Sequence, residues 1–176
     1  FSLYFNLFFR DMDYAQAAEW YEKAAELGDA EAMWVIGIMY ENGRGVDQDY
    51  VQAMEWYEEA AELGDTDAMR RIGNFYSHGE GVEQDYAQAA EWYERAAELG
   101  DAAAMNNMGT LYDLGLGVEQ DYVQALEWFE KAAALGNADA MNNIGVMYEN
   151  GEGVEQDATL AAEWYEKADQ AMQQDY

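Results

Sequence analysis

Residues 32–57 read AMWVIGIMYENGRGVDQDYVQAMEWY, and variants of this stretch recur along the chain of 176 residues. Its landmarks return at a step of 36 residues, as in the two series Gly28, Gly64, Gly100, Gly136 and Trp20, Trp56, Trp92, Trp128, Trp164. Four glycine series of this kind contain all 16 glycines. A fixed period of this size indicates a solenoid of stacked helical units, each burying its apolar face against its neighbours.

Each period carries a start signal for one helix. Asp49 predicts a cap whose side chain accepts hydrogen bonds from free backbone amides, while Gln52 reaches back to the cap amide. The same Asp-x-x-Gln pattern recurs at Asp13, Asp85 and Asp121, and at Asp157 the glutamine is replaced by leucine. Each repeat is expected to contain two helices, a first-type helix before the loop and a second-type helix after it. The pattern predicts five second-type helices.

The apolar spacing predicts which faces of the two helices are buried. In the second-type helix the buried stripe is Ala53, Tyr57 and Ala60, and Gly64 ends the helix in a left-handed conformation. Asp65 then caps a first-type helix, for which the predicted buried stripe is Ala68, Ile72, Gly73 and Tyr76. A glycine inside a helix costs about 1 kcal/mol relative to alanine, so Gly73 predicts close approach of a partner helix.

Composition excludes several classes of function. The formal net charge is -29 and the pI is about 4.1, so nucleic acids and anionic membranes would be repelled. The chain has no cysteine and a single histidine, His78, which excludes thiolate and paired-histidine metal sites and leaves little for proton-transfer catalysis. We predict no enzyme activity, no catalytic residue, no cofactor, no metal site and no membrane span. Cations are expected to associate only loosely with the carboxylates.

The quoted stretch resembles the Sel1-like repeat family, a relative of the tetratricopeptide repeats. The resemblance rests on Ala32, the run Gly37-Ile-Met-Tyr40-Glu-Asn-Gly43-Arg-Gly45-Val, and Asp49-Tyr50 followed by Ala53 and Trp56-Tyr57. It covers about residues 13–168 and implies an all-α, right-handed α-solenoid of helix pairs. It also implies a non-catalytic scaffold that holds proteins or peptides. The family often has proline after the loop Gly-Val, whereas this chain has no proline.

We predict three segments. Residues 1–12 form an aromatic N-terminal segment equivalent to part of a first-type helix, residues 13–168 form the repeat solenoid, and residues 169–176 extend the last helix. The Trp-Tyr pairs recur once per repeat, which favours packing between repeats over a sugar-stacking platform.

The resemblance implies a concave face lined by the first-type helices. Its predicted groove residues vary between repeats while the core positions do not: Trp34, Ile38, Arg70, Asn74, Asn106, Thr110, Asn142 and Val146. Two interpretations stay open. The asparagines bind an extended peptide, with Arg70 meeting an acidic group, or these residues only keep the groove hydrated.

The two ends predict self-association. Residues 1–9 read FSLYFNLFF, a helix apolar nearly all round, in which Leu7 and Phe9 occupy the positions of loop glycines. The predicted contact residues are Phe1, Leu3, Phe5, Phe8, Phe9, Trp164, Tyr165 and Met172. Stacking the end of one copy on the start of the next is a front-to-back contact, which generates a filament unless a ring closes. Each buried phenylalanine contributes about 1.5–3 kcal/mol.

The favoured function is therefore head-to-tail self-assembly, and the alternative is a monomeric adaptor that binds another protein or peptide in the groove. A sequence that starts with Phe1 rather than methionine is expected for a processed chain. This favours an exported or extracellular location, and a cytoplasmic location stays open.

Overall fold

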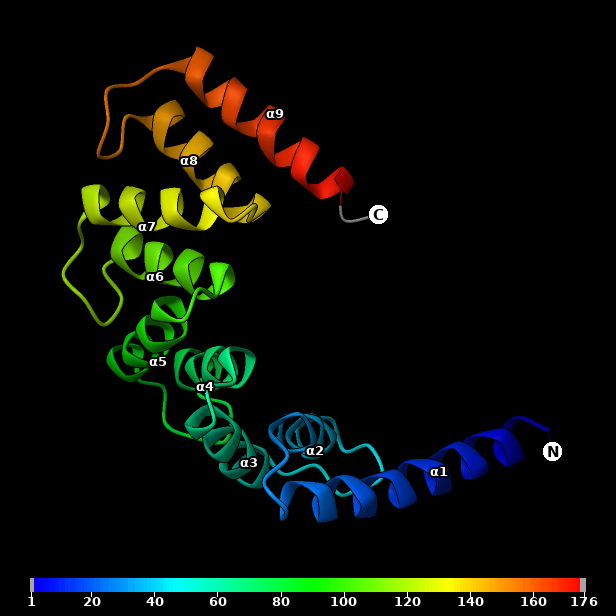
Figure 1. Ribbon diagram of the computed structural model, residues 1–176. Helices are drawn as coiled ribbons and strands as arrows, with labels where there is room; N and C mark the ends of the chain where they lie inside the picture. Colours follow the sequence, from blue (N-terminus) through cyan, green and yellow to red (C-terminus); the bar gives the residue numbers. More distant parts are fainter. Residues whose placement is uncertain (1, 175–176) are drawn as a thin grey trace. The chain divides into compact units, whose positions relative to one another are not determined.

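The computed structural model describes the backbone of residues 2–174 and the side chains of residues 14–173. The described residues form nine α-helices and no strand (Figure 1): α1 (Ser2–Ala25), α2 (Ala30–Asn42), α3 (Tyr50–Glu62), α4 (Thr66–His78), α5 (Tyr86–Glu98), α6 (Ala102–Leu114), α7 (Tyr122–Ala134), α8 (Ala138–Asn150) and α9 (Ala158–Gln174). The prediction of an all-α chain is confirmed.

The chain divides into two compact units. Unit 1, residues 1–84, contains α1 to α4, and unit 2, residues 85–176, contains α5 to α9. In each unit every helix packs against the next one along the chain. Short helices joined by tight loops place residues of successive repeats next to one another. None of the described helices is both long and apolar enough to cross a membrane.

Aspartate caps start α3, α5 and α7, as predicted. The Asp49 Oδ1 atom accepts hydrogen bonds from the backbone amides of Val51 and Gln52, at 2.9 and 3.2 Å. The predicted reach of Gln52 back to the cap amide is wrong. Its Nε2 donates instead to Glu55, at 2.6 Å, because the loop already presents the cap amide of Asp49 to the Tyr40 carbonyl, at 2.9 Å.

The cap also forms where the glutamine is missing. The Asp157 Oδ1 atom accepts from the backbone amides of Thr159 and Leu160, at 2.8 and 3.0 Å. The aspartate alone is therefore sufficient for this helix start.

The predicted helix start at Asp13 is wrong, because α1 runs without a break from Ser2 to Ala25. The physical reason lies in the preceding loop. The equivalent loop glycines Gly43 and Gly45 adopt positive φ angles of 63° and 78°, and Leu7 and Phe9 stand at those positions in α1. Side chains with a Cβ disfavour that conformation, so the turn is replaced by continuous helix.

Helix α3 ends as predicted. Gly64 has a φ of 92°, and its amide donates to the Ala61 carbonyl at 3.0 Å, while the Asp65 amide donates to the Ala60 carbonyl at 3.2 Å. This pair of bonds is a Schellman motif, which satisfies carbonyls that the helix itself leaves free.

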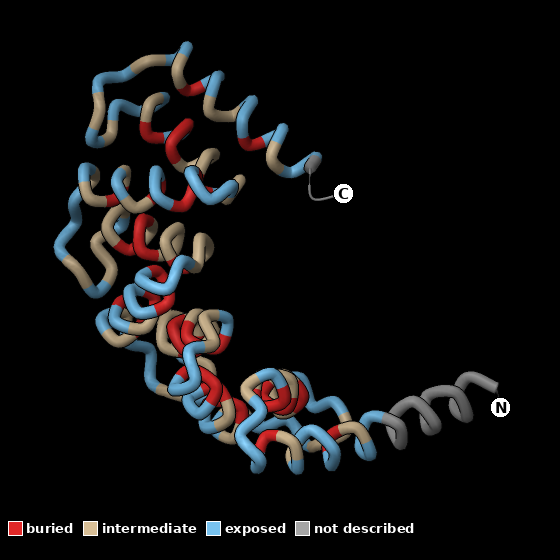
Figure 2. Tube along the Cα trace, viewed as in Figure 1, coloured by how far each residue is buried: buried red, intermediate tan, exposed pale blue. Residues whose placement is uncertain are grey.

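Buried residues recur along the helices of each unit (Figure 2), and the predicted core stripes are among them with one exception. The confirmed positions are Ala53, Tyr57, Ala60, Ala68, Ile72 and Gly73. Tyr76 is only half-buried, and Phe75 is fully buried in its place. Phe75 fits the core because its ring lies edge-on to those of Tyr50 and Tyr57, with centroids 5.7 and 5.8 Å away.

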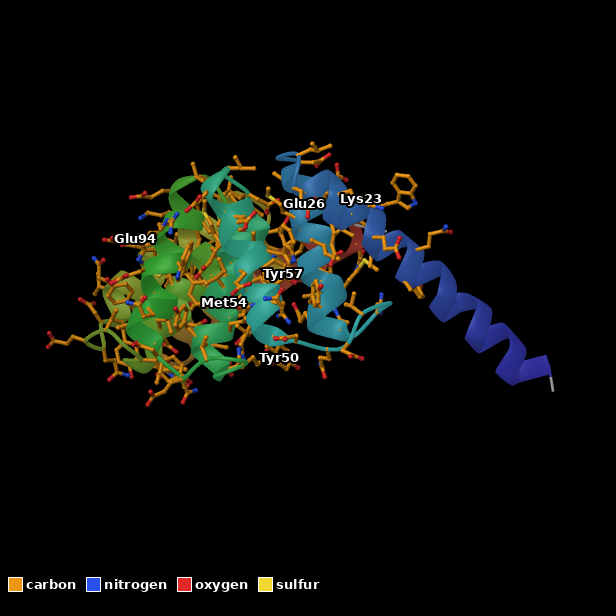
Figure 3. The ribbon with its side chains drawn as sticks, turned by 90° about the horizontal axis from the view of Figure 1, so that it is seen from below. Lys23, Glu26, Tyr50, Met54, Tyr57 and Glu94 are labelled. Carbon is orange, nitrogen blue, oxygen red and sulfur yellow. The ribbon has the colours of Figure 1, made fainter. Side chains whose placement is uncertain are left out.

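Three glycines inside first-type helices, Gly37, Gly109 and Gly145, mark close helix contacts of the kind predicted for Gly73, and for Gly73 itself the close approach stays a prediction. A Cβ added at Gly37 would lie 2.5 Å from Cε1 of Tyr57, which sits between α2 and α3 (Figure 3). Gly109 and Gly145 have the same relation to the rings of Phe129 and Tyr165.

The Trp-Tyr pairs divide into two roles. The second residue of the pair is buried at Tyr57, Tyr93 and Phe129, which confirms the packing prediction there. The tryptophans Trp56, Trp92, Trp128 and Trp164 are only half-buried. In three of them a cation one turn later covers the indole: Arg95, Lys131 and Lys167 lie 4.1, 4.0 and 3.8 Å from the ring centroids.

Candidate functional site

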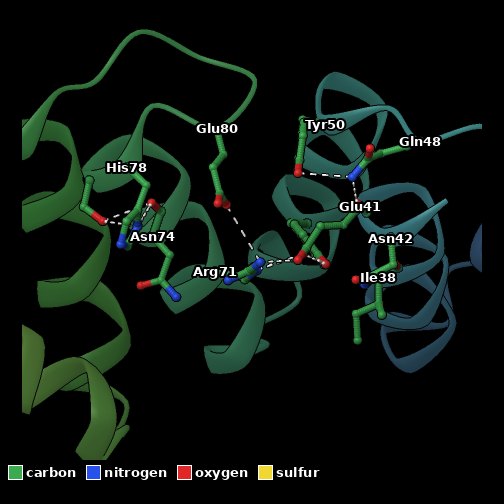
Figure 4. A network of polar contacts seen from close by, with 11 residues as sticks. Ile38, Glu41, Asn42, Gln48, Tyr50, Arg71, Asn74, His78 and Glu80 are labelled. Atoms are coloured by element: carbon green, nitrogen blue, oxygen red, sulfur yellow. Dashed lines mark hydrogen bonds and ion pairs between the residues drawn. The ribbon is translucent and has the colours of Figure 1, made fainter.

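A charged cluster in unit 1 joins three helices (Figure 4). Glu41, in the last turn of α2, accepts a hydrogen bond from the Tyr57 hydroxyl of α3, at 2.7 Å to Oε2. Arg71 of α4 donates from Nε to the same oxygen, at 2.8 Å, and from Nη2 to Oε1. The Glu41 side chain is 11% exposed. The guanidinium therefore engages both oxygens of a largely buried carboxylate.

The surroundings favour the charged pair. The guanidinium of Arg71 also lies 3.9 Å from Glu80 and 5.4 Å from the ring centroid of Phe75. The hydrogen bond to Glu41 raises the pKa of Arg71, and burial together with the bond to Glu41 raises the pKa of Tyr57. Two carboxylates thus share one guanidinium that rests beside an aromatic ring.

Unit 2 has the same positions two repeats later but with different residues. Glu41, Tyr57, Arg71, Phe75 and Glu80 correspond to Asp113, Phe129, Asn143, Met147 and Glu152. Both acidic positions are retained, while the guanidinium and the phenol are absent. A cavity of about 80 Å³ lies here, lined by Thr110, Asp113, Phe129, Asn143, Val146, Met147 and Glu152.

The groups around this cavity are held in place. Asn143 Nδ2 donates to Asn106 Oδ1 at 2.9 Å, and the Thr110 hydroxyl donates to the Asn106 carbonyl at 3.1 Å. Glu152 accepts from Asn150 at 3.3 Å. Among the described residues, none donates a hydrogen bond to the carboxylate of Asp113. Burial, and then the charge of Glu152, raise the pKa of Asp113.

A family model described as the Sel1 repeat matches residues 3–29, 30–65, 66–101, 102–137 and 138–168. The chain belongs to the Sel1 repeat family. Its fold is the all-α solenoid of helix pairs expected from the sequence, and proteins built from Sel1 repeats are non-enzymatic scaffolds that bind protein partners.

Solved structures with Sel1 repeats are similar over most of the chain. A protective antigen of uropathogenic Escherichia coli with an SLR fold is 40% identical, with a TM-score of 0.84 over 87% of this chain. A Sel1 repeat protein from Oxalobacter formigenes is 37% identical, with a TM-score of 0.83 over 91% of this chain and 67% of its own. The chain spans 33% of the length of the antigen. No curated protein matches it.

The predicted groove residues of unit 1 lie on α2 and α4 of its Sel1 repeats. Trp34 is half-buried, with its ring centroid 5.1 Å from that of Tyr57, and Ile38 is half-buried too. Arg70 forms an ion pair with Asp67 on its own helix, and the Asn74 carbonyl accepts from the Ser77 hydroxyl at 3.0 Å. His78 lies beside this carbonyl at the exposed end of α4, with Nδ1 2.8 Å from the oxygen.

The predicted groove residues of unit 2 lie on α6 and α8. Thr110 and Val146 line the 80 Å³ cavity, and Asn106 holds the side chain of Asn143 in its wall. Asn142, which directly precedes Asn143 on α8, is half-buried. The structure therefore brings Thr110 and Val146 together with two carboxylates that were not assigned to the groove.

The predicted self-association residues fall in two regions. Phe1, Leu3, Phe5, Phe8 and Phe9 lie outside the residues whose side chains are described. On α9, Tyr165 is half-buried and donates to Glu149 at 2.8 Å, and Met172 is 40% exposed. Trp164 lies in a hollow of about 450 Å³ between α7, α8 and α9, with Met141 and Lys167 also in its wall.

Sequence reasoning missed the roles of Arg71, Asp113, Asn143 and Glu152. A signal was present in the repeats themselves. The fourth Trp-Tyr pair has Phe129 in place of the tyrosine that the other repeats carry. Arg71 is replaced by asparagine, Asn107 and Asn143, at the equivalent positions of the next two repeats. In the described residues no group of three or more His, Asp, Glu or Cys side chains is arranged to hold a metal ion.

Proposed function

We propose that the chain is an adaptor whose protein partner docks on the surface formed by α6 and α8. The observation that supports this most is the cavity between these helices. Its lining combines polar Thr110 and Asn143 with two carboxylates, and its floor contains the buried Phe129 and Met147. Polar groups fixed around a small apolar floor are typical of binding sites, where they supply orientation and specificity.

Two exposed valines of unit 2 provide a matched test. Val146 on α8 lines the cavity and is 42% exposed, whereas Val123 in the first turn of α7 is 54% exposed and does not line it. Each is replaced, in separate variants, by a photo-cross-linking amino acid. The adaptor function predicts cross-links to another protein from position 146 and none from position 123. Equal cross-linking from both positions, or none from position 146, would argue against it.

The second candidate is head-to-tail self-assembly, and the exposure of α9 supports it. Tyr57 is fully buried in unit 1, while its equivalent Tyr165 is only half-buried and Met172 nearby is exposed. A second copy stacked on α9 would cover both side chains. The contacts predicted for residues 1–9 belong to the same proposal.

Light scattering over a salt series tests self-assembly. Copies that each carry a charge of -29 repel one another, and salt screens this repulsion beyond about 8 Å at physiological ionic strength. Assembly should therefore strengthen with salt or divalent cations and disappear when residues 1–9 are deleted. Assembly that weakens with salt contradicts the proposal. The deletion should leave cross-linking from position 146 unchanged.

An exported or extracellular location is part of the proposal. The similar protein from uropathogenic Escherichia coli is a protective antigen, which supports a location outside the cytoplasm. Fractionation of the source cells, with immunodetection of the chain in each fraction, tests it. Recovery in the cytoplasmic fraction alone would overturn this part.

A further inference from the structure

The chain contains its own example of what binds between these paired acids. In unit 1 the guanidinium of Arg71 lies between Glu41 and Glu80, donates to both oxygens of Glu41, and rests near the ring of Phe75. Guanidinium groups suit this arrangement because their planar fork of donors matches a carboxylate and their weakly hydrated face packs on apolar surface.

Unit 2 keeps the acceptors and the apolar floor of this arrangement. Asp113 and Glu152 occupy the two acidic positions, and Met147 takes the place of Phe75. Asn143 replaces the arginine, but its side chain is shorter, uncharged and bonded to Asn106. No described residue donates a hydrogen bond to the amide oxygen of Asn143, so this oxygen is a further acceptor.

The cavity has the size and the charge for a cationic group. Its volume of about 80 Å³ exceeds the roughly 30 Å³ that one water molecule occupies in the liquid. None of the described residues that line it is positively charged, although two are carboxylates. Asp113 is half-buried with its carboxylate unbonded, and burial and the charge of Glu152 raise its pKa. A cation in the cavity would stabilise the ionised carboxylate of Asp113 and so offset both effects.

We propose that the cavity between α6 and α8 binds the guanidinium of an arginine side chain presented by the partner protein. The arginine takes the position that Arg71 occupies in unit 1, with its fork on Asp113 and its edge toward Glu152. The proposal rests on the adaptor function and specifies its partner as a basic segment containing arginine. The net charge of -29 would also speed the approach of such a segment.

An NMR titration of the full chain with N-acetyl-arginine methylamide tests this directly. The probe carries one guanidinium and no other charge. Saturable shifts are expected at the side-chain amide of Asn143 and the backbone amide of Thr110, and none at Arg71, whose cluster is already filled. N-acetyl-lysine methylamide has the same charge without the planar fork of donors. Half-saturation of the shifts should therefore need a concentration on the order of fivefold higher.

Three variants complete the test. Asn143→Arg should fill the cavity from within, abolish the shifts caused by the probe and raise the melting temperature. Asn142→Arg places the same charge on the neighbouring residue of α8 and should leave the shifts in place. Asp113→Asn removes the main acceptor charge and should weaken the binding of the probe roughly tenfold.

Three outcomes would overturn the proposal. These are the absence of saturable shifts, shifts spread over many acidic residues, and shifts that persist in Asn143→Arg. A preference for the lysine probe would overturn the choice of guanidinium. Because the titration uses no partner protein, its failure leaves the adaptor function to be judged by the cross-linking of position 146.

Discussion

Arg71 on α4 donates hydrogen bonds to both carboxylate oxygens of Glu41 on α2, 30 positions earlier in the sequence. This contact links residues of successive repeats. The Tyr57 hydroxyl donates to the same carboxylate. Since the Glu41 side chain is 11% exposed, loss of its partner would leave a largely buried charge without compensation.

This geometry predicts unequal coupling between Arg71 and its two acids. Double-mutant cycles with Arg71→Met should give a coupling energy of about 1–3 kcal/mol with Glu41→Gln. The Glu80 side chain is 39% exposed and 3.9 Å away, so the cycle with Glu80→Gln should give about 0.2–1 kcal/mol. Urea unfolding of the single and double variants measures both energies. Equal coupling energies would show that the fork on Glu41 is not the stronger contact.

A methyl group at Gly37 should destabilise unit 1. The new Cβ of Gly37→Ala would lie 2.5 Å from the ring of Tyr57, and this ring is fixed by Trp34, by Phe75 and by its hydrogen bond to Glu41. Overpacking costs about 1–3 kcal/mol, and the better helix propensity of alanine returns about 1 kcal/mol. Because a contact of 2.5 Å is far inside van der Waals separation, the cost should lie in the upper part of this range, about 2–3 kcal/mol, and we expect a net loss of about 1–2 kcal/mol in the free energy of unfolding.

Chemical denaturation measures this loss against a control on α3. Glu59 is exposed, so Glu59→Ala should change the free energy of unfolding by less than about 0.5 kcal/mol. A Gly37→Ala variant as stable as the wild type would mean that the Tyr57 ring can move aside, contrary to its fixed position.

The repeated local chemistry made most of the fold predictable. Caps at Asp49 and its equivalents and the left-handed turn at Gly64 depend on residues within one turn of each other, and each signal occurs several times. The error about Gln52 arose because a distant group decided the outcome. The amide of Asp49 is satisfied by the carbonyl of Tyr40, across the loop, which no spacing within the cap reveals.

The candidate site was less predictable because it depends on side chains from three helices. Arg71 and Asn143 occupy equivalent positions, yet the first fills a pair of acids and the second leaves a cavity. Composition shows only an excess of carboxylates. Which carboxylates face each other, and which of them meet a cation, follows from how successive helix pairs pack.

The caps predict a difference between two neighbouring residues at the start of α7. Asp121 Oδ1 accepts from the amides of Val123 and Gln124, at 2.9 and 3.1 Å, while the Gln124 side chain donates to Glu127, at 3.3 Å. Asp121→Ala should therefore lower the free energy of unfolding by about 1 kcal/mol. Gln124→Ala should change it by less than about 0.5 kcal/mol. Similar losses in thermal or urea unfolding would restore the capping role predicted for the glutamine.

Tyrosine ionisation predicts a loss of stability in alkali. A hydrogen bond to Glu22, 2.7 Å from the Tyr40 hydroxyl, followed by burial, raises the pKa of Tyr40 to about 12. In the unfolded chain the pKa of tyrosine is about 10. Between these values the folded chain retains a proton that the unfolded chain releases, so the free energy of unfolding falls as pH rises.

The stabilisation is therefore complete below about pH 10 and is lost as the pH approaches about 12. Urea unfolding at a series of alkaline pH values measures the fall, and the ultraviolet absorbance of tyrosinate follows ionisation in the folded chain. Glu22→Gln removes the charge that acts on Tyr40, so the pKa should move toward about 10 and the fall should become smaller. An identical decline in wild type and Glu22→Gln would assign the alkaline loss to other groups, among them Tyr57, whose pKa is raised by burial and by Glu41.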